Sequence, residues 1–559
     1  MNQKKTYRPD IDGLRALAVL AIILFHFKVS GFPGGFIGVD IFFVISGYLI
    51  TGIIISEIAQ GSFSAVTFWG RRIRRILPAL VTVLIATAVA SYFILILPSD
   101  FSAFGRTLMA QSLFISNWLF MGLSPYFSAP AETMPLLHTW SLAVEEQFYL
   151  FLPLCLILLF RFTKGQASRG LVLIGIALLS FIYGVYLVNS NPTEQFTINF
   201  LPHIWGSATN SSAGFYLIVP RIWELLVGSI IAIYMFEIKN RAIAEMTALV
   251  GIGAIFAGIL LLSDTTPFPG VAALLPVLGT AAIIVANTSH HTITKAMLSF
   301  PAMVWIGLIS YSLYLWHWPI LVLARYYANS INESLSSLHE FLLIILISVL
   351  SILTYRYIEQ PFRKKNFLAE RWEIYLTGAV GLVVVFCIGL IIVNQHGFPQ
   401  RLSPGALLIA DAMEDYSPRR DECFTKSTLR TSPIDTPCLI GVQDPSHIDF
   451  VLWGDSHANA TMPAFEENGL VTNQTGIFFG TTACAPLLSN PPITTNEVCI
   501  QEIQRAVSYI KQDTSLEVFI VAEWQNGYTF VESQRGFYLS TILSNTIAQL
   551  PQEPLVEDQ

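Results

Sequence analysis

Two ionisable side chains, Arg15 and His26, lie in the first apolar stretch of this 559-residue chain. Their separation of 11 positions is about three helical turns, so both would lie near one helix face, roughly 16 Å apart along its axis. Such an arginine could hold a phosphate or a carboxylate, and such a histidine could act as general base on a hydroxyl. A snorkelling arginine and a structural histidine are the alternative that spacing alone leaves open.

Further polar groups accompany the later apolar stretches. Asp40 begins the second stretch at a depth similar to His26, where its carboxylate could orient the imidazole or cap the helix. His138 and Glu145 are seven positions apart, close to two full turns, so both could face one cavity. Glu146 would point to another side of that helix, because adjacent residues do not share a face.

A cluster of arginines occupies a short segment that we expect to be a loop between two apolar stretches. Its members are Arg71, Arg72, Arg74 and Arg75. Arginine pairs bidentately with phosphate, so the cluster could seat a phosphorylated substrate. It also serves as a membrane-topology signal, whatever else it binds.

Ser456 has a physical reason to be a nucleophile. It belongs to the sequence GDSH, which follows the apolar run 448–453 and precedes a stretch that can form a helix. At such a turn, a hydroxyl lies near exposed backbone N–H groups that can stabilise an oxyanion. The alternative is an ordinary turn in which Asp455 and Ser456 cap the helix.

The elements that position these groups follow from the composition. Only 12% of the residues are charged and 53% are hydrophobic, whereas a typical soluble domain has roughly 25% charged residues. This composition excludes a purely soluble protein. A net charge of −7 without a basic tail argues against a nucleic-acid partner, so membrane lipid is the first partner that we expect.

Eleven apolar runs are long enough to cross a hydrocarbon layer of about 30 Å. They lie near residues 14–28, 37–56, 76–97, 140–160, 170–188, 220–236, 246–262, 270–287, 303–324, 341–358 and 373–393. A more polar run at 107–121 decides the topology. If it does not cross, the basic loops all fall on the side of the N-terminus, as the positive-inside rule requires: 71–75, 161–169, 239–241, the loop with Lys295, and 363–371.

We therefore interpret residues 107–121 as a re-entrant or half-buried segment, which is tolerated where protein or a water-filled cavity covers it. The N-terminus is then cytoplasmic, and everything after residue 394 lies outside. Four of the six cysteines belong to that outer part and favour two disulfides, Cys423–Cys438 and Cys484–Cys499. A zinc site with four thiolates is the alternative, but the chain has no C-x2-C pair, and we expect no metal.

The outer part has the composition of a soluble chain. Residues 394–447 are rich in Pro, Asp, Ser and Arg, which predicts a linker or lid with a disulfide loop. Strand-like runs at 448–453, 476–479 and 516–522 then alternate with helical stretches. This alternation predicts a parallel α/β sheet with its reactive groups at the carboxyl ends of the strands.

Two parts of the chain resemble known families. The stretch IDFVLWGDSHANA is similar to the first block of the SGNH esterase and acetyltransferase family, in which the serine of GDSH is the acyl-accepting nucleophile. Nearly all of residues 7–365 resemble the acyltransferase-3 family through blocks in the same order: YRPDIDGLRALAV, FHF, GGFIGVDIFFVISGYLI, RRIRRILPAL, LLHTWSLAVEEQFYL, RIWELLVG, ISYSLYLWHWP and YIEQPFR.

The resemblance implies a bacterial inner-membrane O-acetyltransferase of lipopolysaccharide O-antigen or peptidoglycan. The membrane part would take an acyl group from cytoplasmic acetyl-CoA, with the coenzyme A phosphates on the arginine cluster. Ser456 would relay the group to a hydroxyl of an envelope polysaccharide or a lipid-linked glycan. No bound cofactor is expected besides this donor.

Four more site residues come with the resemblance. Glu224 and His317 join the candidate cavity residues, although the tryptophans on either side of His317 also fit an interfacial aromatic belt. Gly480 and Asn526 would be oxyanion donors. Because no histidine follows His457, the D-x-x-H pair that would serve Ser456 is missing, and we expect an incomplete SGNH domain that transfers acyl groups poorly by itself.

The expected fold is thus a polytopic α-helical membrane protein with about eleven transmembrane helices, followed by a periplasmic α/β SGNH-like domain. Its expected parts are an acyltransferase-3 transmembrane domain (1–365), an extra transmembrane helix (366–393), the linker or lid (394–447) and the partial SGNH domain (448–559). A transporter-like or sensory membrane protein with a degenerate outer module is the alternative function. The oligomeric state stays open.

Overall fold

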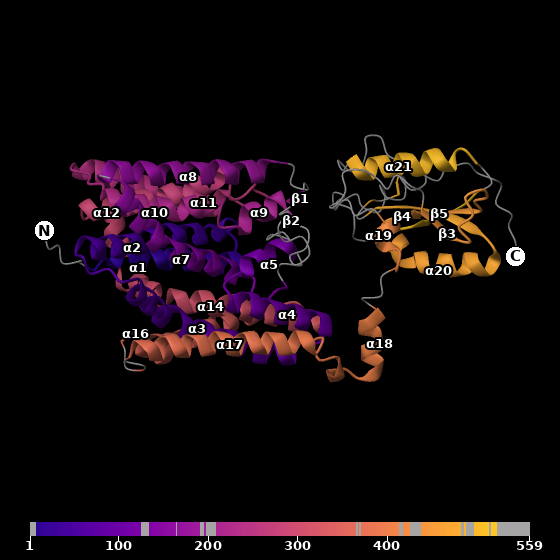
Figure 1. Cartoon of the computed structure of the whole chain (residues 1–559), viewed down its shortest axis with the longest axis horizontal. Coiled ribbons are helices and arrows are strands. Elements are labelled where there is room, and N and C mark those ends of the chain that lie inside the picture. Colours follow the sequence, from indigo (N-terminus) through magenta and orange to yellow (C-terminus); the bar gives the residue numbers. More distant parts are fainter. Residues whose placement is uncertain are drawn as a thin grey trace. The chain divides into compact units, whose positions relative to one another are not determined.

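The computed structural model describes residues 7–123, 133–163, 165–190, 195–196, 208–364, 367, 370–412, 417–424, 438–481, 484, 486–487, 497–513 and 516–522. The chain divides into two units, Met1–Ser403 and Pro404–Gln559. The first is a bundle of long helices, and the second is a small sheet with helices on its faces (Figure 1).

The first unit consists of helices, the longest of which follow the expected apolar runs. They are α1 (Pro9–His26), α2 (Gly38–Ala59), α3 (Ala65–Ile94), α4 (Pro98–Ser112), α5 (Ser116–Leu123), α7 (Thr139–Phe162), α8 (Gln166–Asn189), α9 (Asn210–Tyr216), α10 (Ile222–Tyr234), α11 (Arg241–Leu261), α12 (Leu274–Ser289), α13 (Ile293–Leu298), α14 (Pro301–Ser330), α15 (Ser337–Thr354), α16 (Gln360–Arg363) and α17 (Arg371–Asn394). A π-helical turn, Tyr355–Glu359, joins α15 to α16. The short strands β1 (Gln195–Phe196) and β2 (Ala208–Thr209) pair antiparallel.

Within the described residues, nine helical stretches are long and apolar enough to cross a membrane. They are Gly35–Ala59, Ala65–Ile94, Thr139–Phe162, Gln166–Asn189, Arg241–Leu261, Val271–Ser289, Pro301–Ser330, Ser337–Arg363 and Trp372–Asn394. Two other expected spans coincide with α1, whose first two turns carry Asp10, Asp12 and Arg15, and with α10, which has only 13 residues.

The polar run at 107–121 is not one continuous helix. Phe114, with a left-handed φ of 54°, separates α4 from α5. Polar groups of this segment bond to one another inside the bundle, since the buried Ser116 hydroxyl donates to Gln111 Oε1 at 2.7 Å. A broken segment with internal hydrogen bonds is consistent with the half-buried segment that the charge pattern predicts.

Two helix pairs approach closely at glycines, and both crossings serve the site. α2 packs along α10, where a Cβ on Gly228 would lie 2.0 Å from the Val44 carbonyl oxygen. α1 packs along α14, where a Cβ on Gly307 would lie 1.8 Å from the Asp12 carbonyl oxygen. Only glycine permits such contacts between backbones, which are common between membrane helices.

The chain leaves α17 through a tightly held turn. His396, Gly397 and Phe398 all have positive φ, of 48°, 72° and 59°. A Cβ on Gly397 would lie 1.9 Å from the Pro98 carbonyl oxygen, so this position requires glycine. The Arg401 guanidinium covers the Phe101 ring at 4.6 Å and donates to the carbonyl oxygens of Tyr92, Leu95 and Gly397.

The second unit has a four-stranded sheet in the order β3-β5-β4-β6. Its elements are α18 (Pro404–Ala412), α19 (Arg420–Cys423), β3 (Cys438–Gly441), β4 (Phe450–Gly454), α20 (Ser456–Thr472), β5 (Thr475–Gly480), α21 (Glu497–Ile510) and β6 (Glu517–Val521). β4 pairs parallel with β5 and β6, which confirms the expected parallel core. β3 adds an antiparallel strand from within the stretch 394–447 that we expected to be a linker or lid.

Alternating side chains bury both faces of this sheet. Leu452 and Phe478 belong to the core on the side of α20, whereas Val451 and Phe479 belong to the core on the side of α21. Strand side chains alternate between faces, so these almost wholly apolar strands need a helix on each side. Figure 1 shows α20 and α21 covering opposite faces.

Two disulfides staple this unit, and they confirm the predicted pairing. Cys423–Cys438 joins α19 to β3, and Cys484–Cys499 joins the loop after β5 to α21. Each closes a separation of 15 residues. In the loop-entropy account, a closure of that length contributes about 3 kcal/mol to stability.

Candidate active site

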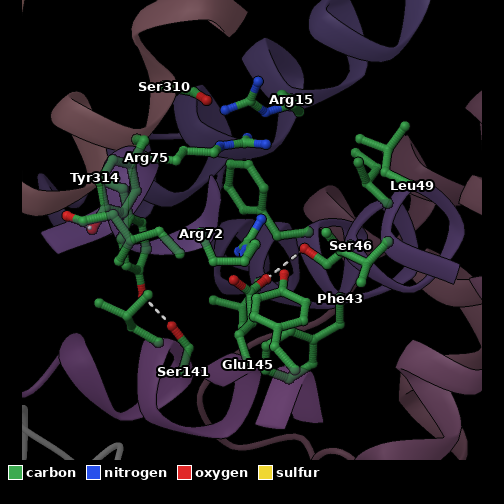
Figure 2. A pocket seen from close by; sticks show the side chains of 18 residues that line it. Arg15, Phe43, Ser46, Leu49, Arg72, Arg75, Ser141, Glu145, Ser310 and Tyr314 are labelled. Carbon is green, nitrogen blue, oxygen red and sulfur yellow. Dashed lines mark hydrogen bonds between the residues drawn. The ribbon is translucent and has the colours of Figure 1, made fainter. Parts of the chain in front are cut away.

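A cavity of about 90 Å³ lies inside the helix bundle. Residues of α1, α2, α3, α7 and α14 line it (Figure 2). The residues are Arg15, Val39, Phe42, Phe43, Ile45, Ser46, Leu49, Ile50, Arg72, Arg75, Ile76, Ser141, Leu142, Glu145, Tyr149, Ser310, Tyr311 and Tyr314. The lining therefore combines an apolar wall with three arginines and several hydroxyl groups.

The arginines make this cavity positive. Arg15 is paired with Asp12 at 3.1 Å, and Arg72 lies 3.6 Å from Glu146. Arg75 has like-charged neighbours in both of these arginines, and the described residues place no carboxylate within ion-pairing distance of it. Figure 2 shows the three guanidinium groups following one another along the cavity. An anionic ligand would relieve their mutual repulsion.

The other two members of the predicted arginine cluster do not reach the cavity. Arg71 pairs with Glu57 at 2.8 Å, and its side chain is 46% exposed. The Arg74 guanidinium donates to backbone carbonyl oxygens beyond α16. The expected loop is in fact part of α3, on which Arg72 and Arg75 line the cavity while Arg71 and Arg74 bind groups outside it. The prediction of a loop was therefore wrong, and of the cluster only Arg72 and Arg75 line the cavity.

Glu145 lies in the cavity, where the charge of its carboxylate faces the arginines. The Ser46 hydroxyl donates to its Oε1 at 2.7 Å. The neighbouring Glu146 turns to Arg72 instead, which agrees with the expectation that only one of the two acids faces the cavity. His138, expected to share this cavity, lies just beyond the lining residues.

Three histidines meet beside the cavity. His26 Nδ1 lies 3.1 Å from His317 Nε2, and the ring centroids of His138 and His317 are 5.6 Å apart. All three are buried, with relative exposures of 7%, 2% and 0% for His26, His138 and His317. Within the described residues, no group of three or more His, Cys, Asp or Glu side chains is arranged to hold a metal ion.

The tryptophans next to His317 are not an interfacial belt. Trp316 and Trp318 are both buried, and their indole N–H groups donate to Thr354 Oγ1 at 2.9 Å and to the Met134 carbonyl oxygen at 2.8 Å. The Trp318 ring lies 4.4 Å from the His26 ring between centroids. These side chains therefore form the walls around the histidines.

Tyr314 joins the cavity to the histidines. Its hydroxyl lies 2.7 Å from Ser141 Oγ in the cavity wall and donates to the His138 carbonyl oxygen at 2.8 Å. Its own carbonyl oxygen lies 2.7 Å from His317 Nδ1. Arg15 and His26, roughly 16 Å apart along α1, thus belong to two adjoining parts of one site.

Asp40 does not orient His26, contrary to our expectation. Its carboxylate pairs with Arg221 at 2.7 Å, and Arg221 also pairs with Glu224 at 2.8 Å. All three side chains are at most 1% exposed, so this is a buried triad that ties α2 to the start of α10. Arg221 was missed, although its spacing of three residues from Glu224 in RIWE signals an ion pair on one helix.

Ser456 lies at the carboxyl edge of the sheet of the second unit, as expected. Gly454, at the end of β4, is paired with Gly480 on β5 and with Val521 on β6, so three parallel strands end together there. Ser456 is the first residue of α20, and its side chain is exposed. The capping interpretation of GDSH is confirmed for Asp455, which accepts the His457 N–H at 2.8 Å, while the nucleophilic role of the serine presented at the strand end stays a prediction.

In the part of the second unit that the structure describes, His457 does not supply a base for Ser456. The His457 ring turns back to Asp455, with Nδ1 at 3.2 Å from Oδ1. Asn526, the expected third oxyanion donor, lies outside the described residues. Glu502 on α21 is a carboxyl that the sequence does not single out, and it is almost fully buried beside Arg505, at 3.9 Å.

Burial raises the pKa of Glu502 to about 6, and Arg505 offsets only part of that effect. The folded state then binds the proton more tightly than the unfolded state, so the stability of the second unit falls as the pH rises from about 4.5 to about 6. We expect Glu502→Gln to raise its free energy of unfolding at pH 7.5 by about 2 kcal/mol and to change it little near pH 4.

Hydrogen–deuterium exchange of β5 and α21 in the full chain, with variant and wild type compared at each pH, measures this difference. Glu467→Gln, on the exposed side of α20, is the matched control and should leave exchange unchanged. A Glu502→Gln variant that loosens β5 at pH 7.5 would show that the ionised carboxylate stabilises the fold.

Comparisons with known proteins agree with this two-part architecture. Residues 8–357 match the family described as an acyltransferase domain, and residues 422–555 match the SGNH domain that is fused to such acyltransferase domains. The chain is 30% identical over 431 residues to the peptidoglycan O-acetyltransferase OatA of Listeria monocytogenes, covering 71% of this chain and 66% of that protein. It is 31% identical over 376 residues to the O-acetyltransferase OatA of Staphylococcus aureus, covering 65% and 58%.

The chain spans about three fifths of the length of the curated relatives that it matches. No solved structure matches it. The acyltransferase match alone covers more than half of the chain and includes the cavity and the histidines. The chain therefore belongs to the acyltransferase-3 family, with an SGNH domain fused after the membrane helices.

Proposed function

We propose that this chain is a membrane O-acyltransferase that takes an acyl group, acetyl first of all, from acyl-coenzyme A and passes it to a hydroxyl of a cell-envelope polysaccharide. The observation that carries the proposal is the positive cavity joined through Tyr314 to a buried pair of histidines. The names of the O-acetyltransferase relatives support the same reaction class.

The cavity suits the donor. Arg72, Arg75 and Arg15 can bind the phosphates of coenzyme A, because guanidinium groups pair bidentately with phosphate. The apolar wall suits the long, uncharged arm that ends in the thioester. That arm can bring the thioester toward the histidines, so phosphate binding and chemistry occupy the two parts of the site.

His26 then acts as general base. It takes the proton from the accepting hydroxyl while the oxygen attacks the thioester carbonyl carbon and forms the ester. The C–S bond breaks, and the proton leaves on the coenzyme A thiol. A buried imidazole within hydrogen-bond reach of the hydroxyl is the side chain best suited to that transfer near neutral pH.

The second unit completes the reaction in this proposal, with Ser456 as acyl relay. Its exposed hydroxyl at the sheet edge attacks the ester formed in the membrane unit, so that the acyl group passes to Ser456 and the first accepting hydroxyl is released with the serine proton. A sugar hydroxyl then attacks the Ser456 ester, forms the final ester and returns the proton to the serine oxygen. O-antigen is the first candidate acceptor, and peptidoglycan, which the name of one relative specifies, is the second.

Mass spectrometry of both polymers tests the proposal directly. Deleting the gene should remove acetyl groups from one of the two, the native gene should restore them, and Ser456→Ala should leave them at background. The matched control, Ser446→Ala, changes an exposed serine away from the sheet edge and should restore them. Full acetylation with Ser456→Ala would show that the membrane unit finishes the transfer itself, and no change on deletion would overturn the proposed function.

We further propose that the N-terminus is cytoplasmic and the outer unit periplasmic. The charge asymmetry of the loops supports this orientation. A phosphatase reporter fused after residue 400 should be active only on the periplasmic side, and one fused near residue 165 should be inactive. A cytoplasmic reporter after residue 400 would contradict the two-sided scheme.

A further inference from the structure

We propose that His317 is a positioning residue that fixes the tautomer of His26 and makes His26 Nε2 the basic nitrogen of the site. The role of His26 as a base rests on the proposed function. The tautomer itself rests only on hydrogen-bond chemistry within α1 and α14.

The first step concerns His317. Its Nδ1 lies 2.7 Å from the carbonyl oxygen of Tyr314, one helical turn earlier on α14. A carbonyl oxygen can only accept, so His317 Nδ1 carries the proton. A neutral imidazole has a single N–H, which leaves His317 Nε2 as an acceptor.

The second step concerns His26. His317 Nε2 lies 3.1 Å from His26 Nδ1, and the two ring planes differ by only 14°. Because Nε2 of His317 carries a lone pair, His26 Nδ1 must be the donor of this bond. The proton of neutral His26 is thereby fixed on Nδ1, and its Nε2 keeps the lone pair.

The surroundings favour neutral rings. His317 is fully buried and His26 nearly so, with Trp318 packed against the His26 ring and His138 as a further neighbour of His317. A charged imidazolium is costly in such an apolar enclosure, whereas two neutral rings joined by one hydrogen bond are not. Arg325 adds a constraint, since it donates to the His26 carbonyl oxygen at 2.6 Å and fixes the end of α1.

The consequence for catalysis is a choice between two nitrogens. With the proton on Nδ1, Nε2 can take the proton of a hydroxyl. With the opposite tautomer, Nε2 would carry the N–H. The lone pair would then be on Nδ1, facing His317, where it cannot take the proton of a hydroxyl. Holding the reactive tautomer through the second nitrogen is the role that outer partners of functional histidines commonly have.

Nitrogen-15 NMR of histidine-labelled full chain tests the tautomer without any activity assay. The His26 signals, assigned by their loss in His26→Gln, should show Nδ1 protonated and Nε2 bare in the wild type. In His317→Phe, which keeps a ring but has no acceptor, this preference should shift toward the Nε2–H form. Protonated Nε2 in the wild type would overturn the proposal.

Acyl transfer measured in the same variants supplies the functional arm. His317→Gln can place its amide oxygen near the position of Nε2 and accept from His26, so it should keep activity within about tenfold of wild type. His317→Phe should lose about 10²–10³-fold in kcat with little change in KM for the donor, which is the scale of a lost general base. His291→Gln, an exposed histidine, is the matched control.

The two proposals fail in different ways. Equal activities of His317→Phe and His317→Gln, with the same His26 tautomer in both, would overturn the positioning role while leaving the acyltransferase intact. Inactivity of the wild type toward both envelope polymers, with His26 protonated on Nδ1, would overturn the proposed function and leave the tautomer assignment standing.

Discussion

Replacement of His26 by alanine is expected to lower acyl transfer by about 10²–10⁴-fold, the usual contribution of a general base, while the amount of protein in the membrane stays unchanged. The imidazole lies at the end of α1, in a wall built by other side chains, and adds little to the apolarity of that helix. Transfer of radiolabelled acetyl to isolated envelope polysaccharide, normalised to protein in the membrane fraction, measures the effect.

The matched control for this variant is His291→Ala, which removes an exposed histidine of the same unit. It should leave both transfer and protein level as in the wild type. His26→Ala with wild-type transfer would mean that the histidine pair is only a packing element. A loss of membrane protein that parallels the loss of transfer would argue for a folding role instead of a chemical one.

The second large effect should come from the face of α3 that lines the cavity. Arg75→Ala is expected to raise KM for the acyl donor by roughly 10–10²-fold, since a hydrogen bond to a charged group contributes about 1.5–3 kcal/mol. Arg75 is the most informative arginine to replace, because its neighbours Arg15 and Arg72 already have carboxylate partners. Donor dependence of acetyl transfer in membrane vesicles gives KM and kcat separately.

Arg71→Ala offers an internal control in the same turn of the same helix. Its side chain is half exposed and pairs with Glu57, away from the cavity, so donor KM should stay within about twofold. Equal increases in KM for Arg71→Ala and Arg75→Ala would mean that a diffuse positive surface, and not the cavity, binds the donor.

The sequence predicted where the helices lie along the chain better than it predicted the contacts between them. Apolar runs mark the long helices because each must be apolar along its own length, and cysteine order predicted both disulfides. The phase of α3 was missed, because the expected break before residue 76 hid a helix that starts at Ala65. Even with that start known, the helical period places Arg75 within about 40° of Arg71, so only the packing of α3 in the bundle separates Arg72 and Arg75 from Arg71 and Arg74.

Contacts between distant helices were beyond the sequence for a different reason. At similar depth, the Asp40 carboxylate could meet either His26 or Arg221. The close crossing of α2 with α10 places it next to Arg221. His26 and His317 lie 291 positions apart in the sequence. Their contact likewise depends on the crossing of α1 with α14. A helix period says which residues share a face but not which helix that face meets.

The turn at residues 396–398 has a mechanical consequence for the outer unit. Because Arg401 and the residues around Gly397 are bound to the ends of α3 and α4, the stretch from 395 to 402 adds no slack to the chain that follows it. The tether of Ser456 therefore starts at residue 403 and not at the end of α17. A force on the second unit is therefore transmitted to α3 and α4 as well as to α17.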